Sequence, residues 1–372
     1  MREFVPPPRT YTGPGSITAL ADSIEGENVH VITDDGIVEA GVLDDVLDHL
    51  PVEPTVHTDV SANPTRETVL ELATRVSDAD YVVGVGGGSA MDATKAACTL
   101  PAFPDDVART LEVSPETRVT KSDRATPFVL VPTTAGTGTE TGYWAVISDH
   151  DRGEKRSIGH PSMLADVAVL DPECTESLPP KVTAATGFDV VTHAVESLVA
   201  NGASTITIPY SRRAYALATA SLRTAVLEGD DLAARTRMLE ASYLAGVAMN
   251  NAGLGAVHAI SHAIGGEYDL PHGHVNAVLL PTVVRENGNR SARVREQFAS
   301  IVESTGPAHE LLADQLRRLR RDVGLDELPA ETPAEWAWDD ISSFAVDNIN
   351  MQTNPIQYTE SEITDLCRDV FE

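Results

Sequence analysis

The N-terminal half of the chain alternates short apolar runs with longer amphipathic stretches. After an extended start with turns over residues 1–25, the short runs predict strands, and the 3.6-residue periodicity between them predicts helices. Strands are expected at residues 28–33, 55–60, 80–86, 127–132 and 166–171. Helices are expected at residues 37–50, 64–77 (with Asn63 as a cap) and 90–100. Such an alternation predicts a Rossmann-like parallel sheet with helices on both faces.

The pattern changes after Pro179, where strand signals become few. Long runs rich in Ala, Leu and Arg predict helices, for example at residues 210–228, 231–250 and 293–304. A chain of 372 residues is long enough for two cores. We therefore expect an α/β domain over residues 1–178 and an all-α domain over residues 179–372.

The charge balance is strongly acidic. The chain has 56 Asp and Glu residues against 27 Lys and Arg residues, which gives a formal charge of −29. Such a surface repels itself in dilute buffer and is screened by salt, so we interpret it as halophilic, with an ordinary acidic protein as the alternative. Nucleic acid is excluded as a partner, because its binding depends on neutralising phosphates.

Targeting signals are also informative. No apolar run reaches the ~18 residues of a membrane span, and the N-terminus lacks the apolar core of a signal peptide. The cysteines, Cys98, Cys174 and Cys367, are scattered without metal or disulfide spacing. We therefore expect no membrane association and a cytoplasmic location.

A histidine-rich stretch, residues 255–281, carries the strongest chemical signal. His258 and His262 are four residues apart in a run of helical character, so both project from one face. Gly265-Gly266 is expected to loosen this helix, and the turn Pro271-His272-Gly273 can bring a third imidazole back toward that face. Ala259 stands where a zinc peptidase of the HExxH type has its glutamate base, which argues against a peptidase.

A second pair at helical spacing lies earlier, at Asp189 and His193. Together the two regions supply a carboxylate and at least two imidazoles, enough for a metal site with an open position. The alternative is that these histidines are hydrogen-bonded core residues.

Two loops have the character of phosphate-binding loops. Residues 84–89 (GVGGGS) follow a strand and open a helix, where backbone N–H groups can receive a pyrophosphate, although an ordinary tight turn is the alternative. Asp34 ends the first clear strand and is a better candidate for the ribose than Asp105-Asp106, which we place in a Pro-rich loop. A carboxylate at Asp34 favours NAD over NADP. The second loop, residues 132–140, supplies four threonines and two glycines.

Four separated motifs resemble the iron-containing (group III) alcohol dehydrogenases. They are GGGSAMDATKAA (residues 86–97), PTTAGTGTE (132–140), GFDVVTHAVES (187–197) and VHAISHAIGG…PHGHVNAVLLP (257–281). The resemblance covers nearly the whole chain. It implies a dehydroquinate-synthase-like architecture: a dinucleotide-binding α/β domain, a helical domain, and an active site in the cleft between them.

The resemblance also implies roles for individual residues. The metal ligands would be Asp189, His193, His258 and His272, and His262 would lie beside the nicotinamide and assist proton transfer. The cofactor-binding residues would be Asp34, Gly87, Gly88, Ser89, Asp92, Thr133, Thr134, Thr137, Val146 and Lys155. Two positions depart from the family: Thr139 replaces a common serine, and TNPI (residues 353–356) replaces a frequent TNPR.

The activity expected from the resemblance is that of an NAD(P)-linked alcohol dehydrogenase, which interconverts an alcohol and an aldehyde or ketone by direct hydride transfer. A Lewis-acidic metal, Fe²⁺ or Zn²⁺, would assist, and a homodimer is expected. Alternatives on the same fold are maleylacetate reductases, which lack the aspartate present here as Asp189, and glycerol or glycerol-1-phosphate dehydrogenases, whose loops differ from PTTAGTGTE. A non-catalytic nucleotide- or metal-binding protein would bind NAD or metal without turnover.

Overall fold

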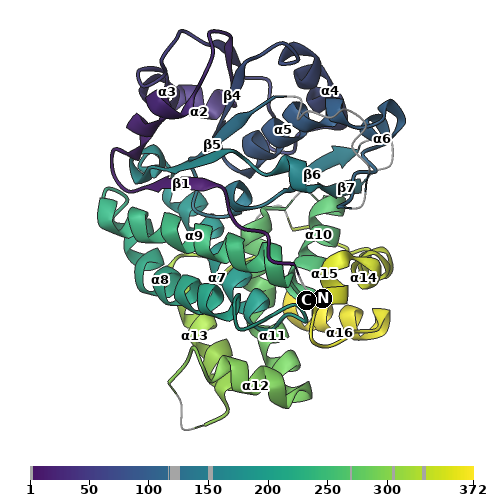
Figure 1. Ribbon diagram of the computed structural model, residues 1–372. Coiled ribbons are helices and arrows are strands. Elements are labelled where there is room, and N and C mark those ends of the chain that lie inside the picture. Colours follow the sequence, from purple (N-terminus) through teal and green to yellow (C-terminus); the bar gives the residue numbers. More distant parts are fainter. Residues whose placement is uncertain are drawn as a thin grey trace. The chain divides into compact units, whose positions relative to one another are not determined.

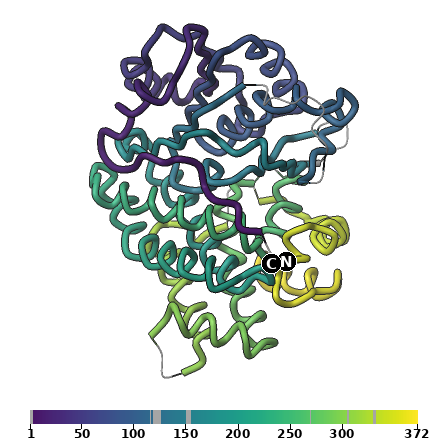
Figure 2. The backbone as a smooth tube through the Cα atoms, in the orientation of Figure 1, coloured from purple at the N-terminus to yellow at the C-terminus, as the bar shows by residue number. Residues whose placement is uncertain are grey.

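A computed structural model describes residues 3–115, 117, 126–149, 154–268, 270–303, 306–328 and 332–372. The chain divides into two compact units, which we treat separately. The N-terminal unit comprises Val5–Ser177, and the C-terminal unit comprises Leu178–Glu372 together with the short segment that ends at Phe4. Figure 1 shows a sheet in the first unit and packed helices in the second, and Figure 2 traces the same backbone as a tube.

The N-terminal unit is built on a six-stranded sheet in the order β1-β8-β5-β4-β2-β3, and every pairing is parallel. The strands are β1 (Arg9–Thr12), β2 (Val29–Ile32), β3 (Thr55–His57), β4 (Tyr81–Gly86), β5 (Phe128–Pro132) and β8 (Val167–Leu170). The predicted parallel sheet is confirmed. The N-terminal segment, which we expected to be extended with turns, supplies β1 at the sheet edge.

Helices cover both faces of this sheet, as Figure 1 shows. The helical elements are η1 (Ser16–Ala19), α1 (Leu20–Ser23), α2 (Asp35–Glu39), α3 (Val42–Leu47), α4 (Arg66–Arg75), α5 (Gly88–Thr99), η2 (Leu100–Ala102), α6 (Asp105–Thr110), η3 (Thr139–Thr141), η4 (Pro161–Met163) and η5 (Pro172–Thr175). Side chains of β4 alternate between two cores: Val82 packs with α4 and α5, whereas Val83 and Val85 pack with α1 and α3.

Three local predictions were wrong. The helix expected over residues 37–50 is two helices, α2 and α3, because Gly41 takes a left-handed φ of 77° between them. The cap of α4 is Thr65, whose hydroxyl accepts a hydrogen bond from Thr68 N, and not Asn63. Asp105 and Asp106 begin helix α6 and do not lie in a loop.

An antiparallel hairpin was not predicted. Its strands are β6 (Trp144–Asp149) and β7 (Glu154–Gly159), and they form a two-stranded sheet of their own. The hairpin carries two of the residues that the family resemblance assigns to the cofactor, Val146 and Lys155.

In the C-terminal unit every described regular element is a helix, as predicted. The helices are α7 (Pro180–Val199), α8 (Ile208–Leu227), α9 (Leu232–Ala252), α10 (Ala256–Tyr268), α11 (His272–Arg290), α12 (Ala292–Phe298), α13 (Ala308–Asp322), α14 (Trp338–Asp347), α15 (Ile349–Thr353) and α16 (Glu360–Phe371). Helix α7 packs against α8, α9 and α11, and α10 packs against α11 and α14.

Two predictions for the helical unit need correction. Helix α10 continues through Gly265-Gly266 to Tyr268, so the glycines do not interrupt it. Helix α12 ends at Phe298, short of the predicted residue 304. None of the helices in the described part of the chain combines the length and hydrophobicity that crossing a bilayer requires.

Candidate metal centre and cofactor loops

Three helices of the C-terminal unit bring the predicted metal ligands together. Helix α7 carries Asp189 and His193, α10 carries His258, and α11 begins with His272. A close approach of α11 to α7 is possible because residue 273 is glycine: a Cβ there would lie 2.1 Å from the carbonyl oxygen of Ala185. The glycine that follows His272 therefore places this imidazole beside α7.

The ligand atoms converge on one carboxylate oxygen. Asp189 Oδ1 lies 3.4 Å from His258 Nε2, 3.6 Å from His193 Nε2 and 3.8 Å from His272 Nε2. The ligand atoms of Asp189, His258 and His272 all lie within 4.8 Å of one another, a spacing at which one ion can contact them all. The His193 ring stacks on that of His258, with centroids 4.6 Å apart.

Glu196 supports this set from the next turns of α7. Its Oε2 atom lies 2.6 Å from His258 Nδ1, and its Oε1 atom accepts a hydrogen bond from Val257 N at 2.7 Å. Because a carboxylate only accepts, Nδ1 carries a proton, and Nε2 is the ring nitrogen that faces Asp189 and could bind a metal after losing its own proton. We did not predict this residue, although its spacing after Asp189 and His193 places it on the same helical face.

Burial and charge adapt the site to a cation. Burial alone would raise the pKa of Asp189, but His193 and the other imidazoles outweigh it and hold this pKa well below its usual range. Burial would lower the pKa of His258, yet the hydrogen bonds to Asp189 and Glu196 raise it to about 9. One carboxylate oxygen with imidazole nitrogens is a donor set that suits Fe²⁺ or Zn²⁺, so these residues fit the metal.

The remaining two histidines of the stretch differ. His262 is half-buried, with its ring centroid 5.3 Å from that of His272 and 5.9 Å from that of His258. It therefore adjoins the ligand set. His274 is buried, and its Nε2 atom lies 2.7 Å from the carbonyl oxygen of Glu327. This contact gives His274 a structural role outside the ligand set.

In the N-terminal unit, the glycine loop joins β4 to α5. Gly86 has a φ of 146°, and a Cβ there would lie 2.8 Å from Ala90 Cβ and 3.2 Å from Asp34 Oδ2. Asp34 therefore adjoins this loop, while its Oδ1 atom accepts a hydrogen bond from Ile37 N and caps α2. Burial raises the pKa of Asp34. Gly87, Gly88 and Ser89 lie at the start of α5, and Ser89 donates to the carbonyl oxygen of Ala62.

The threonine loop lies against the glycine loop. A Cβ on Gly88 would lie 2.8 Å from Thr137 Cγ2, and one on Gly87 would lie 3.6 Å from Thr134 Cγ2. The Oγ1 atoms of Thr133 and Thr137 are buried and have no hydrogen-bond partner in the described part of the chain. Buried hydroxyls normally find partners, so this pair fits a bound polar group such as a dinucleotide.

A buried charge cluster fixes the threonine loop to α5. Lys95 Nζ donates to Thr139 Oγ1 and to the carbonyl oxygen of Trp144, both at 2.8 Å, and Thr139 in turn donates to Asp92 Oδ1 at 2.5 Å. Asp92 Oδ2 accepts from Val146 N at 2.9 Å. Asp92 and Val146, both assigned to the cofactor by resemblance, are thus bonded to each other. Lys155 lies opposite Ser148 in the hairpin.

Burial perturbs the titration of this cluster. Burial lowers the pKa of Lys95 to about 8, although the charges of Asp92 and Glu140 act to raise it. Burial also raises the pKa of Glu140 to about 7. Lys95 is fully buried. Its charge is therefore the local counter-charge for two buried carboxyl groups.

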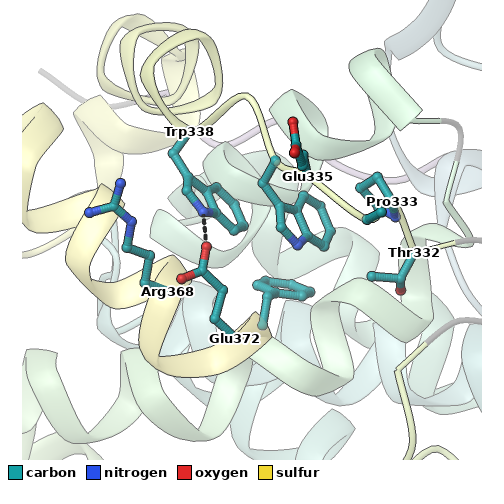
Figure 3. Close-up of a pocket in the computed structure, with 9 residues that line it drawn as sticks. Thr332, Pro333, Glu335, Trp338, Arg368 and Glu372 are labelled. Atoms are coloured by element: carbon teal, nitrogen blue, oxygen red, sulfur yellow. Dashed lines mark hydrogen bonds between the residues drawn. The ribbon is translucent and has the colours of Figure 1, made fainter.

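A separate aromatic pocket of the C-terminal unit has a volume of about 550 Å³ (Figure 3). Trp336 stacks on Trp338 with ring centroids 4.6 Å apart, and the Trp338 indole N–H donates to Glu372 at 2.7 Å. Its lining includes none of the predicted metal or cofactor residues, so we do not assign it to the candidate site.

Comparison with known proteins places the chain in a family. The model of the iron-containing alcohol dehydrogenases matches residues 7–172, and that of the C-terminal part of the same family matches residues 183–371. The chain therefore belongs to the iron-containing alcohol dehydrogenase family, and it is a metal-dependent oxidoreductase that acts on alcohols.

Individual relatives agree. Long-chain-alcohol dehydrogenase 1 of Geobacillus thermodenitrificans is 37% identical over 336 residues, covering 86% of this chain and 83% of that protein. Alcohol dehydrogenase from Oenococcus oeni aligns over the full length of both chains with a TM-score of 0.92 and 31% identity.

Two further structures also align with all of this chain. One is the archaeal halo-thermophilic alcohol dehydrogenase ADH/D1 of a Red Sea brine pool (TM-score 0.89, 25% identity, all of that chain). The other is sulfoacetaldehyde reductase from Bifidobacterium kashiwanohense in complex with NAD⁺ (TM-score 0.89, 27% identity, 98% of that chain).

Proposed function

We propose that this protein is an NAD-linked alcohol dehydrogenase whose metal is held by Asp189, His193, His258 and His272. The observation that carries the proposal is the convergence of three imidazole Nε2 atoms on Asp189 Oδ1 at 3.4–3.8 Å. When bound, Fe²⁺ supplies Lewis acidity toward the substrate oxygen and the nicotinamide supplies or accepts a hydride. The same donor atoms accept Zn²⁺, and iron is preferred because of the family.

His262 is the proposed proton-transfer residue. It adjoins the ligand set without belonging to the three-residue group that can contact one ion. Imidazole is a common general acid and base in enzymes, so His262 would take a proton as alcohol is oxidised and return it as a carbonyl compound is reduced.

The proposed cofactor site uses the two loops of the N-terminal unit. Backbone N–H groups at Gly87, Gly88 and Ser89 open α5 and would receive the pyrophosphate. The hydroxyls of Thr133 and Thr137 would bond to the cofactor, with Thr134 beside them. Asp92 supports the loop through Thr139 and Val146, and Lys155 completes the set proposed from the family.

NAD is the proposed dinucleotide, with NADP disfavoured. The Asp34 carboxylate adjoins the glycine loop and would accept from the ribose 2′-hydroxyl, whereas it would repel a 2′-phosphate. The sulfoacetaldehyde reductase whose structure aligns with this chain is a complex with NAD⁺, which supports the same choice.

The proposed setting is a salt-rich cytoplasm. A formal charge of −29 and the likeness to an alcohol dehydrogenase from a halo-thermophilic archaeon support a haloarchaeal type of enzyme. We further propose a homodimer, and small alcohols and aldehydes as substrates.

The experiment that tests this function is NADH oxidation with a panel of short aldehydes and ketones in molar KCl. Protein loaded anaerobically with Fe²⁺ is compared with protein stripped by a chelator, and NADPH is run in parallel. We expect turnover only in the loaded protein and faster turnover with NADH. Equal rates with and without metal would overturn the metal assignment and favour a metal-free reductase.

A further inference from the structure

Asn276 lies among the metal ligands but is not one of the residues assigned to the metal. It is fully buried and follows His272 by one turn of α11, so both side chains share a helical face. Its Nδ2 atom donates to Asp189 Oδ1 at 2.8 Å and lies 3.1 Å from His272 Nε2 and 3.5 Å from His258 Nε2. One amide group thus faces three of the four proposed ligand atoms.

A second buried asparagine of α11, Asn287, has the hydrogen bonds expected of an amide with a purely structural role. Asn287 donates to Asn354 Oδ1 at 3.2 Å and accepts from the Tyr358 hydroxyl at 2.9 Å, so both ends of its amide are bonded to the surrounding fold. In contrast, Asn276 Oδ1 is buried and has no hydrogen-bond partner in the described part of the chain. Among the described residues, the hydrogen bonds of the Asn276 side chain run only to the proposed ligands.

The contacts of the Asn276 amide would change when a metal binds. A bound cation would use the Nε2 lone pairs of His258 and His272, so those two contacts of Asn276 cannot persist as hydrogen bonds. The carboxylate oxygen of Asp189 has further lone pairs and can serve the cation and the amide together. A charge-assisted hydrogen bond in a buried site is strong and fixes the direction of the oxygen.

We propose that Asn276 is a positioning residue of the metal centre: its amide N–H holds Asp189 Oδ1 in the orientation that faces the cation. Before metal binding the same amide also bonds to the imidazole of His272 and keeps the ligand atoms together. This inference rests on the proposed metal assignment.

The test is the metal affinity of Asn276→Leu, a variant of similar volume that removes both amide atoms. We expect Zn²⁺ and anaerobic Fe²⁺, each measured in competition with a chromogenic chelator, to bind roughly 10- to 100-fold more weakly, as is typical when a ligand loses its outer partner. The midpoint of thermal unfolding of the metal-free protein should change little, because the unpartnered buried oxygen is lost as well. If Asn276→Leu does not fold, Asn276→Ala serves the same comparison.

Asn287→Ala is the matched control, a buried amide of the same helix without contact to the ligands. It should lower the unfolding midpoint and leave the metal affinity of the folded protein unchanged. The reverse result for Asn276, a lower midpoint with unchanged metal affinity, would show a structural role and overturn the inference. If the unmodified protein bound neither ion, the metal assignment itself would fail, which is a distinguishable result.

A spectroscopic measurement adds a readout that stability does not affect. Co²⁺ can be loaded in place of the native metal, and its visible absorption bands depend on the arrangement of the ligand atoms. We expect Asn276→Leu to shift these bands at saturating Co²⁺ because Asp189 is no longer oriented, and Asn287→Ala to leave them unchanged. Identical spectra for Asn276→Leu and the unmodified protein would contradict a positioning role.

Discussion

His258 Nδ1 lies 2.6 Å from Glu196 Oε2, and both side chains are buried. The contact joins α10 to α7 and determines which ring nitrogen of His258 is free to face Asp189. It is the clearest sign that the cluster is organised for a ligand, because the imidazole is oriented from the side opposite to Asp189.

The first prediction concerns this contact. Glu196→Gln keeps the size of the side chain but replaces the charged acceptor of His258 with a neutral amide. We expect metal affinity to fall roughly 10- to 100-fold, the usual cost of altering an outer partner. Isothermal titration with Zn²⁺ measures it, with Glu310→Gln as a control on a carboxylate that pairs with Arg285 outside the cluster. Unchanged affinity in Glu196→Gln would refute the orienting role.

The second prediction concerns the buried charge cluster of the N-terminal unit. Lys95→Met leaves Asp92 and Glu140 without their buried counter-charge, and breaking such a pair costs about 3–5 kcal/mol. Urea unfolding at a pH near 7, below the pKa of about 8 at which Lys95 loses its charge, measures the loss. Lys181→Met, at an exposed lysine, is the control and should have little effect. A loss below about 1 kcal/mol in Lys95→Met would be typical of an exposed pair and would contradict the role of Lys95.

The third prediction concerns two loops that meet at a glycine. In Gly88→Ala the new methyl group would lie 2.8 Å from Thr137 Cγ2, so the Thr137 side chain must shift. We expect the affinity for NADH to fall at least about tenfold, which corresponds to about 1.4 kcal/mol of binding free energy, because Thr137 is displaced. The fluorescence of bound NADH measures this affinity. The bound metal should be retained. Gly266→Ala, with no atom within 4 Å of its Cβ, is the control. Equal NADH affinity in Gly88→Ala would argue against a cofactor at these loops.

The fourth prediction is a pH dependence of stability. His30 Nδ1 lies 2.9 Å from His57 Nε2 between neighbouring strands, and burial lowers the pKa of both imidazoles below the usual 6.5. The unfolded chain therefore binds protons at a higher pH than the folded chain. Stability from this pair is complete above pH 6.5 and is lost as the pH falls from 6.5 toward the folded pKa values.

Thermal unfolding between about pH 5 and pH 8 in molar KCl measures this dependence. We expect His57→Gln to reduce the slope of the unfolding midpoint with pH below 6.5. His49→Gln, at a histidine bonded to the carbonyl oxygen of Asp45, should keep the slope. A slope unchanged in His57→Gln would mean that other groups cause the acid sensitivity.

The metal ligands could be predicted from the sequence where their spacing is local. Asp189 and His193 are one turn of α7 apart, so the pattern alone places them on one helical face. Periodicity could not choose between His272 and His274. The choice depends on α11 beginning at His272, because a residue two positions later on a helix points about 200° away.

Other parts of the fold could not be predicted from local pattern. The contacts of Glu196 and Asn276 join different helices, and each depends on how closely those helices approach. The β6–β7 hairpin was missed because its two strands form a sheet separate from the six-stranded one and interrupt an otherwise regular alternation of strand and helix. The split between α2 and α3 depends on the single backbone angle at Gly41.

The most direct test of the account is the metal content and turnover of Asp189→Asn. Metal per chain is measured by mass spectrometry after loading with Fe²⁺, and NADH oxidation with a short aldehyde is measured on the same sample, with circular dichroism as a check of folding. We predict that the folded variant loses both its metal and its turnover, because the oxygen on which the imidazoles converge is no longer charged. A folded Asp189→Asn protein that retains turnover would contradict the assignment of the metal centre.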